Sequence, residues 1–201
     1  MRFLVTGLQM RALDQHTIKN LGIPGIQLMT TAGEAVAEFC KTIMSESGLT
    51  TVVCGKGNNG GDGFVVAASL ARSGHSVAVF VFGERSAISG DAALALETID
   101  EMLPSENLEI HFAGEDLFEA TFHESLGASV LVIDALLGTG INKPVRELLG
   151  EAIEKINSSG CPIISVDIPS GVDSSTGEIL GSAIFADATI TFAFEKRGHH
   201  Q

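Results

Sequence analysis

The sequence contains no Trp and no Tyr, and all of its large aromatic side chains are 11 Phe residues. Proteins that bind unpaired bases usually offer aromatic side chains for stacking, so a single-stranded nucleic-acid platform is not indicated. Positive charge is also scarce, because 12 Lys and Arg face 25 Asp and Glu and the formal net charge is -13. Such a surface repels phosphate backbones and anionic lipids. We therefore expect neither nucleic acid nor a membrane as a partner.

Cysteine is the next scarce residue. The sequence has Cys40, Cys54 and Cys161 and no CxxC pair, which indicates neither a disulfide framework nor a zinc site. A reducing compartment, the cytoplasm, is the expected location. No apolar run is long enough to span a membrane. The first residues reach Thr6 and Gly7 too early to form the apolar centre of a signal peptide.

Apolar strand-like runs alternate with helix-like segments from residue 50 onward. The strand-like runs are residues 50–54, 76–82, 108–112, 130–134, 163–167 and 188–194, and the helix-like segments between them are 62–73, 89–103, 116–125 and 145–158. Two further helices are expected at 10–20 and 26–46, flanking the sheet. Continuous apolar strands between helices are typical of a parallel sheet covered on both faces. The sequence therefore predicts one doubly wound α/β domain over residues 1–201.

The most unusual stretch is residues 54–64, in which five of eleven residues are glycine and Asn58, Asn59 and Asp62 lie between them. Its Gly55–Gly60 segment fits the GxGxxG pattern of dinucleotide-binding loops, with Glu84 as the ribose-binding acid of a hydride-transfer enzyme. Asp62 argues against that interpretation, because a carboxylate at the helix start competes with a pyrophosphate. We expect a ligand on this loop, but not a dinucleotide bound in the ordinary pose of a hydride-transfer enzyme.

Asp134 and Asp167 each end an apolar strand beside glycines. Either one could simply cap the next helix, but the carboxyl ends of parallel strands share one edge, where ligands bind. One carboxylate with the oxygens of Asn59 and Ser170 would suit a hard cation, and a second could act as general acid or base. Lys143 is either a solvated surface residue or a phosphate contact.

Several blocks of the sequence, taken in order, resemble the NAD(P)HX epimerase family. They are Leu13-Asp14, residues 22–25 (Gly-Ile-Pro-Gly), Leu28-Met29, residues 55–63, residues 134–140, residues 166–171 (Val-Asp-Ile-Pro-Ser-Gly), Thr191-Phe192 and residues 196–198. The resemblance implies a three-layer α/β/α Rossmann-like fold with a mostly parallel sheet, and a homodimer. It implies an isomerase that interconverts the R and S epimers of NADHX and NADPHX, the hydrated forms of the cofactors, so that an S-specific dehydratase can restore NAD(P)H.

The resemblance also assigns residues. It implies a potassium ion held by Asn59, Asp134 and Ser170, and makes Asp167 our candidate catalytic acid or base. The residues it implies for the dinucleotide are Asn58, Asn59, Gly60, Gly61, Asp62, Gly138, Thr139, Gly140, Ile141, Asn142, Lys143, Pro144 and Asp167.

Two departures from the family pattern bear on these expectations. Thr30-Thr31 stands where members often carry Glu-Asn, which would alter a dimer or pocket contact. The chain also ends soon after Lys196, so we expect an N-terminal part of a longer, bifunctional protein. The alternative function is a non-catalytic nucleotide-binding scaffold of the same fold, which retention of Asp62, Asp134 and Asp167 disfavours.

Overall fold

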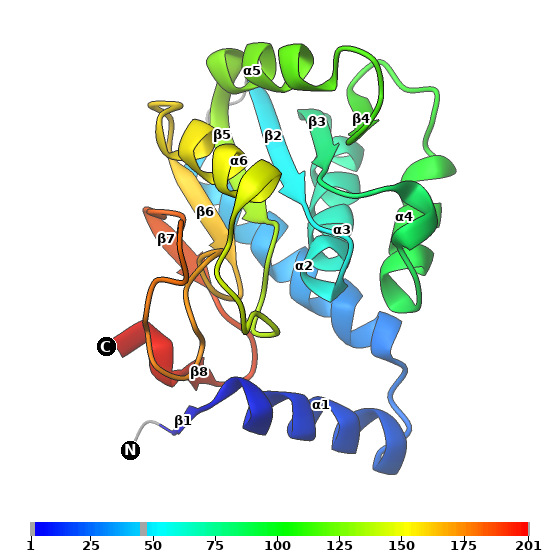
Figure 1. Ribbon diagram of the computed structural model, residues 1–201. Helices are drawn as coiled ribbons and strands as arrows, with labels where there is room; N and C mark the ends of the chain where they lie inside the picture. The colour runs from blue at the N-terminus through cyan, green and yellow to red at the C-terminus, as the bar shows by residue number, and fades with distance from the viewer. Residues whose placement is uncertain (1–2, 45–47, 201) are drawn as a thin grey trace.

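The computed structural model describes residues 3–44 and 48–200. At its centre lies a 6-stranded sheet in the order β4-β3-β2-β5-β6-β7, in which every neighbouring pair is parallel (Figure 1). The strands are β2 (Leu49–Cys54), β3 (Ser76–Val81), β4 (Leu108–Phe112), β5 (Ser129–Ala135), β6 (Ile163–Val166) and β7 (Ala188–Ile190). The predicted parallel sheet is thus confirmed.

Helices cover both faces of this sheet, as the sequence predicts. On one face lie α2 (Gly25–Ile43), α3 (Asn58–Arg72) and α4 (Asp91–Asp100), and on the other lie α5 (Phe118–Ala128) and α6 (Glu147–Asn157). Successive residues of a strand point to opposite faces, so Val52 and Cys54 pack in the first core cluster and Val53 in the second. Because both faces are covered, most strand positions are apolar, and the buried polar exceptions in the strands are Thr50, Thr51, Asp134 and Ser165.

Outside the three layers lie α1 (Gly7–Asn20) and a small 2-stranded parallel sheet of β1 (Leu4–Val5) and β8 (Glu195–Lys196). Figure 1 shows α1 crossing beneath the sheet rather than covering one of its faces. Short 3-10 helices follow at Arg85–Ala87 and Arg197–His200. No helix among the described residues is both long and apolar enough to cross a bilayer.

Most predicted elements differ from the observed ones by one to three residues at an end, and three elements near the expected site differ in ways that matter for it. The helix expected at 26–46 ends at Ile43, and the last of its expected residues lie outside the described part of the chain. The strand expected at 188–194 ends at Ile190, because Ala193 adopts a φ of 55° and turns the chain. The helix expected at 62–73 begins at Asn58, so Asp62 lies one turn inside it. The β1–β8 pair was not predicted, since two residues are too few to show an alternation of apolar and polar side chains.

The strand order places a topological switch between β2 and β5. From β2 the chain moves outward to β3 and β4, and from β5 it moves outward in the opposite direction to β6 and β7. In open parallel sheets, such a reversal leaves a crevice at the carboxyl ends of the two central strands, where ligands bind. The segments that follow Cys54 and Ala135 therefore border the expected site.

Candidate functional site

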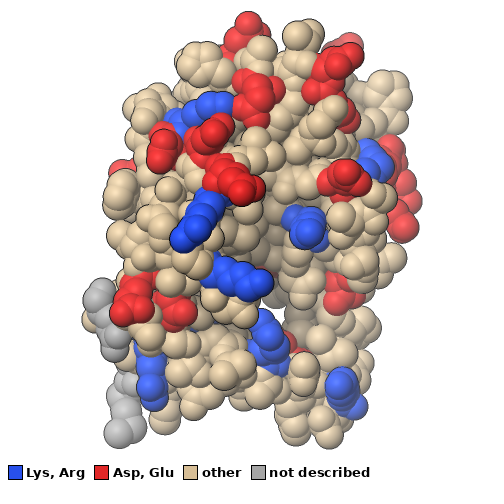
Figure 2. Space-filling view, viewed as in Figure 1, with Lys and Arg blue, Asp and Glu red and all other residues tan. Residues whose placement is uncertain are grey.

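A pocket of about 1040 Å³ lies at this switch point. Its walls come from the segment after β2 with the start of α3, the segment after β5, one side of α1, the first half of α2, and the stretch between β7 and β8. Figure 2 shows this face of the molecule hollowed, with Lys and Arg side chains on the rim of the hollow. The volume is sufficient for a ligand of dinucleotide size, since pockets for small ligands occupy about 300–1,000 Å³.

The structure brings many of the predicted binding residues to this pocket. Those that line it are Asn58, Asn59, Asp62, Gly138, Thr139, Gly140, Ile141 and Asp167. Asn142, Lys143 and Pro144 are not among its lining residues in the described part of the chain, and all three are exposed. Gly60 and Gly61 are buried behind the wall. Asp134 and Ser170 are fully buried beneath it.

The glycines of α3 allow this wall to form. A Cβ atom at Gly60 would lie 1.8 Å from the carbonyl oxygen of Gly55, and one at Gly61 would lie 2.6 Å from Sδ of Met29. The contact at Gly60 is with backbone and excludes any side chain, whereas a side chain at Gly61 would require Met29 to move. The first turn of α3 can therefore pack directly on the preceding loop and on α2. In this position, Asn58 and Asn59 line the pocket.

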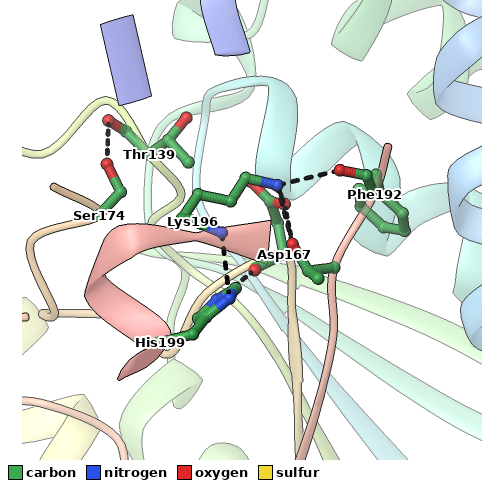
Figure 3. Close-up of polar contacts among 7 residues, drawn as sticks. Thr139, Asp167, Ser174, Phe192, Lys196 and His199 are labelled. Carbon is green, nitrogen blue, oxygen red and sulfur yellow. Dashed lines mark hydrogen bonds and ion pairs between the residues drawn. The ribbon is translucent and has the colours of Figure 1, made fainter. Parts of the chain in front are cut away.

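A buried ion pair lies at the floor of the pocket. The ammonium group of Lys196, 1% exposed, donates to Oδ1 of Asp167, to Oγ1 of Thr191 at 2.8 Å and to the carbonyl oxygen of Phe192 at 3.2 Å (Figure 3). Thr191 in turn donates to the same Asp167 oxygen at 3.2 Å. An ammonium group has three protons, and all three are used here. Asp167 is left with Oδ2, which has no donor among the described residues.

His199 holds the backbone at this carboxylate. Nδ1 of His199 accepts from the N–H of Lys196 at 3.3 Å, so Nε2 carries the proton and donates to the carbonyl oxygen of Asp167 at 3.1 Å (Figure 3). Burial is the main cause of a lowered pKa for His199, and the Lys196 charge adds to it. Asp167 has a φ of 68°, a left-handed conformation that costs free energy outside glycine and often occurs at functional sites.

Two of the three other carboxyl groups that line the pocket have pKa values that respond to the charge of Asp167. These are Asp14 from α1 and Asp62 from α3. Burial raises the pKa of Asp62 well above its usual range, and the charges of Asp167 and Asp14 raise it further while Lys196 opposes them. Burial and Asp167 also raise the pKa of Asp14. The pocket therefore combines the carboxyl group of Asp167, which is paired with the ammonium group of Lys196, with that of Asp62, whose raised pKa favours the protonated form.

Asp134 lies behind the pocket and is fully buried without a cationic partner among the described residues. Its Oδ2 accepts from Ser165 Oγ at 2.7 Å and from the Ser170 N–H at 2.9 Å, and its Oδ1 accepts from Ser170 Oγ and the Leu136 N–H. Burial raises the pKa of this carboxyl group, and these hydrogen bonds oppose that shift. A simple helix cap is therefore not its role.

The residues expected to hold potassium fit such an ion. Nδ2 of Asn59 is buried and has no acceptor, and amide O and N positions are assigned from hydrogen bonds. Turning this amide over would place Oδ1 there, as a cation requires. Asn59 lies against Gly138, whose Cβ would be 3.2 Å from Cγ of Asn59, and Ser170 Oγ lies 3.1 Å from the Leu137 carbonyl oxygen. No group of three His, Cys, Asp or Glu that could hold a metal ion is found among the described residues. A cation at this set would be held by amide, hydroxyl and carboxylate oxygens, which are the ligands that hard cations prefer.

Sequence reasoning missed several residues of this site. Lys196 and Asp14 appear in the blocks that carry the family resemblance, but nothing in their spacing assigned them a role. Thr191 also appears in one of those blocks without an assigned role, and His199 gave no signal at all, since it reaches Asp167 only through the turn after β7. The arginine of α1, Arg11, also lines the pocket and carries no recognisable motif.

Comparison with known proteins identifies the family. Residues 25–198 match the family model of the YjeF-related protein N-terminus. The chain is 34% identical over 194 residues to the NAD(P)H-hydrate epimerase of Limosilactobacillus fermentum, a match that covers 96% of this chain and 87% of the relative. It is 35% identical over 194 residues to the NAD(P)H-hydrate epimerase of Rhodopirellula baltica, covering 96% of this chain and 76% of that one.

Two further comparisons concern length and fold. The bifunctional NAD(P)H-hydrate repair enzyme of Thermofilum pendens is 35% identical over 191 residues, which is 95% of this chain and 36% of the relative. The crystal structure of yeast ynu0 superposes with a TM-score of 0.84 at 24% identity, covering 98% of this chain and 83% of that one, which supports the fold. The chain belongs to the family of YjeF-related N-terminal domains.

Proposed function

We propose that this protein is an NAD(P)H-hydrate epimerase, an isomerase that interconverts the R and S forms of NADHX and NADPHX. Relatives of that name cover nearly all of this chain. The observation that carries the proposal is the side chain of Asp167 at the floor of a dinucleotide-sized pocket. Its Oδ1 is fixed by Lys196 and Thr191, while its Oδ2 has no donor among the residues that the structure describes.

The chemistry requires groups that move protons next to one carbon atom. The stereocentre is C6 of the hydrated nicotinamide ring, and its inversion requires that the C–O bond break and re-form or that the ring open and close. In the first route the departing oxygen gains a proton and leaves as water, and water then adds to the other face of C6 and loses a proton. A carboxyl group that holds a proton and a carboxylate that accepts one therefore serve both halves of the reaction.

Asp62 and Asp167 fit these two roles. Two carboxyl groups that share a site but differ in their surroundings can divide the roles of acid and base. The pKa of Asp62 is raised well above its usual range by burial and by Asp167, so Asp62 is the proton donor, whereas Asp167, which is paired with the ammonium group of Lys196, is the proton acceptor. Because the protons of Lys196 are all used within the protein, Lys196 positions Asp167 and does not itself transfer a proton.

Potassium belongs to the same proposal. Asn59, Asp134 and Ser170 would hold it, and when bound it would supply positive charge that offsets repulsion between the acidic pocket and the cofactor phosphates. Activity should therefore be higher in potassium than in a buffer of large organic cations. A readout independent of activity is thermal stability, which potassium should raise in the wild type and not in Asn59→Ala, since a ligand stabilises the state that binds it.

A coupled assay tests the reaction. The R epimer of NADHX is supplied with an S-specific dehydratase and ATP, and NADH formation is followed with and without this protein. We expect the protein to accelerate NADH recovery, and Asp167→Asn to remove the acceleration. Asn tolerates the left-handed backbone of position 167 better than Ala does, so this variant tests the carboxylate and not the turn.

The scaffold alternative has its own expected outcome. If folded protein binds a dinucleotide but neither epimer is converted faster than without it, the pocket is a binding module and the acid–base roles of Asp62 and Asp167 are wrong. We also propose that the protein is a homodimer, which light scattering tests, and that one domain spans the chain. We further propose functional coupling to a dehydratase, as the bifunctional relatives suggest. The free thiols of Cys40, Cys54 and Cys161 suit a reducing compartment such as the cytoplasm.

A further inference from the structure

The backbone at the pocket floor holds Asp167 in a strained turn. The N–H of Ile168 donates to the carbonyl oxygen of Val166 at 2.8 Å, across Asp167 with its φ of 68°. A bond of this span around a central residue of positive φ defines the rare and strained form of the γ-turn. The N–H of Asp167 donates to the carbonyl oxygen of Ile190 at 2.8 Å. Its own carbonyl oxygen has one donor among the described residues, Nε2 of His199 at 3.1 Å.

A second turn of the same kind is joined to the first by Lys196. The N–H of Phe194 donates to the carbonyl oxygen of Phe192 at 2.6 Å, across Ala193 with its φ of 55°. The ammonium group of Lys196 donates to that carbonyl oxygen at 3.2 Å and also to the Asp167 carboxylate. Strained backbone persists only where the surrounding structure over-determines it. Both turns therefore depend on a fixed position for Lys196.

The turn that follows Lys196 carries His199 back to the pocket floor. Gly198 is the second of the four residues in this 3-10 helix, and a Cβ atom there would collide with the carbonyl oxygen of Asp173. The N–H of Gly198 donates to the carbonyl oxygen of Ser174 at 3.0 Å. The 3-10 helix is thus seated directly on the backbone of that segment, which places the His199 ring between Lys196 and the Asp167 turn (Figure 3).

The two ring nitrogens of His199 act in opposite senses. Nδ1 accepts from the backbone N–H of Lys196 at 3.3 Å, and Nε2 donates to the Asp167 carbonyl oxygen. Only the neutral ring with its proton on Nε2 makes both bonds, because the protonated ring has two donors and no acceptor. A proton on Nδ1 would face the N–H of Lys196, so protonation breaks the connection between Lys196 and the Asp167 turn.

The surroundings of His199 favour the neutral ring. Burial is the main cause of its lowered pKa, and the charges of Lys196 and His200 lower it further. Asp167 opposes them, through the hydrogen bond at its carbonyl oxygen and through its charge. His200 is exposed and is itself paired with Glu195, 2.8 Å from Nε2. The ring therefore has a cationic neighbour on each side along the chain and one carboxylate opposite.

The remaining charged groups near this cluster do not pair with the ring. The carboxylate of Asp173, on the segment beneath the 3-10 helix, accepts from two N–H groups of its own turn. Arg197 is exposed. Asp14 from α1 and Asp62 from α3 interact with the charge of Asp167. None of these groups supplies an acceptor that would hold a proton on Nδ1 of His199 among the described residues.

We propose that neutral His199 is a positioning residue for the epimerisation, and that its protonation slows the reaction at acidic pH. This proposal rests on the proposed function, because Asp167 is the group whose position His199 controls. His199 is not among the described residues that line the pocket. It therefore acts through Lys196 and the backbone of the Asp167 turn, and not by contact with the substrate.

NMR of the imidazole nitrogens tests the arrangement without any catalysis. In ¹⁵N-labelled protein at about pH 8, the His199 signals are assigned by their absence from His199→Gln. We expect a protonated Nε2 and an unprotonated Nδ1, and a titration midpoint below the ordinary value of about 6.5, because the pKa of His199 is lowered. A proton on Nδ1 in the neutral ring, or a midpoint at or above about 6.5, overturns the proposal.

Kinetics with two substitutions test the catalytic role. His199→Phe removes both hydrogen bonds and should lower kcat about tenfold at pH 8, with KM changed less than about twofold, because no substrate contact is lost. His199→Gln keeps a donor for the Asp167 carbonyl and does not become protonated. It should recover most of kcat and lose less activity than the wild type when pH falls from about 7.5 to 5.5. His200→Gln, the same change at the exposed neighbour, should keep the wild-type kcat at pH 8.

The outcomes separate this proposal from the proposed function. An active epimerase in which His199→Phe keeps the wild-type kcat, or in which His199→Gln loses as much activity in acid as the wild type, overturns the role of His199 alone. If His199→Phe does not fold, the pH profile of His199→Gln decides. A wild type that shows the expected tautomer and midpoint but no epimerase activity overturns the proposed function, and the catalytic role of His199 with it.

Discussion

Replacing Lys196 by Met should strongly destabilise the fold, although the two side chains are similar in length. The Lys196 side chain is 1% exposed and that of its partner Asp167 is 14% exposed. Met cannot donate a hydrogen bond, so Asp167 would keep only Thr191 as a donor to its side chain, and the Phe192 carbonyl would lose its own. The buried carboxylate would then have no compensating charge.

The expected size of the effect follows from this geometry. Removing one partner of a buried ion pair costs about 3–5 kcal/mol of unfolding free energy. For a chain of roughly this size, each kcal/mol lowers Tm by about 2–4 °C, so the variant should unfold about 6–20 °C below the wild type. Urea denaturation and calorimetry measure the two quantities independently.

A double variant provides the control. Asp167→Asn combined with Lys196→Met removes both charges and keeps a residue that accepts the left-handed backbone of position 167, so it should be more stable than Lys196→Met alone. If Lys196→Met costs less than about 1 kcal/mol, as an exposed ion pair would, or if the double variant is the less stable, the buried pair does not hold the floor of the pocket.

Other consequences can be tested on the same material. Gly60→Ala should cost about 3 kcal/mol of unfolding free energy, since its Cβ would lie 1.8 Å from a backbone oxygen. Gly57→Ala, whose new Cβ would have no atom of other described residues within 4 Å beyond its chain neighbours, should cost less than about 1 kcal/mol. Equal losses would contradict the close packing of α3 on the preceding loop. Asp62→Asn should abolish epimerisation. Since the pKa of Asp62 is raised in the folded state, ionisation destabilises the fold, and Asp62→Asn should gain stability over the wild type as pH rises above the ordinary range of Asp, about 4. A constant difference from pH 4 to 9 would refute the raised pKa.

Much of the fold could be predicted from the sequence because it depends on periodicity. Strands buried on both faces are apolar at most positions, and this pattern predicted all six strands of the central sheet and the helices between them. Element ends were less predictable, because they depend on contacts made in three dimensions. The helix after β2 begins at Asn58 rather than Asp62 since Gly60 and Gly61 serve close packing inside the helix, whereas in sequence they suggest a loop.

The site was predictable only where residues follow strand ends. Asp134 and Asp167 could be placed at one edge of the sheet by topology alone. Lys196 reaches Asp167 through a turn at Ala193, whose φ of 55° has no sequence signature. Arg11 lines the pocket because the first turn of α1 packs against the 138–140 loop. This is a contact between segments more than a hundred residues apart in the sequence. Pairings of this kind depend on tertiary structure and leave no local pattern.

The proposed epimerase activity is most directly tested by following the two epimers of NADHX themselves. Purified R and S forms of NADHX are incubated separately with this protein in potassium buffer, without dehydratase, and their ratio is measured by chromatography over time. We expect both samples to approach the same ratio of R to S epimers, much faster than without protein. Asp167→Asn should accelerate the change in neither sample. If the folded protein leaves both epimers at their spontaneous rates, it is not an epimerase of these compounds and the proposed roles of Asp62 and Asp167 are wrong.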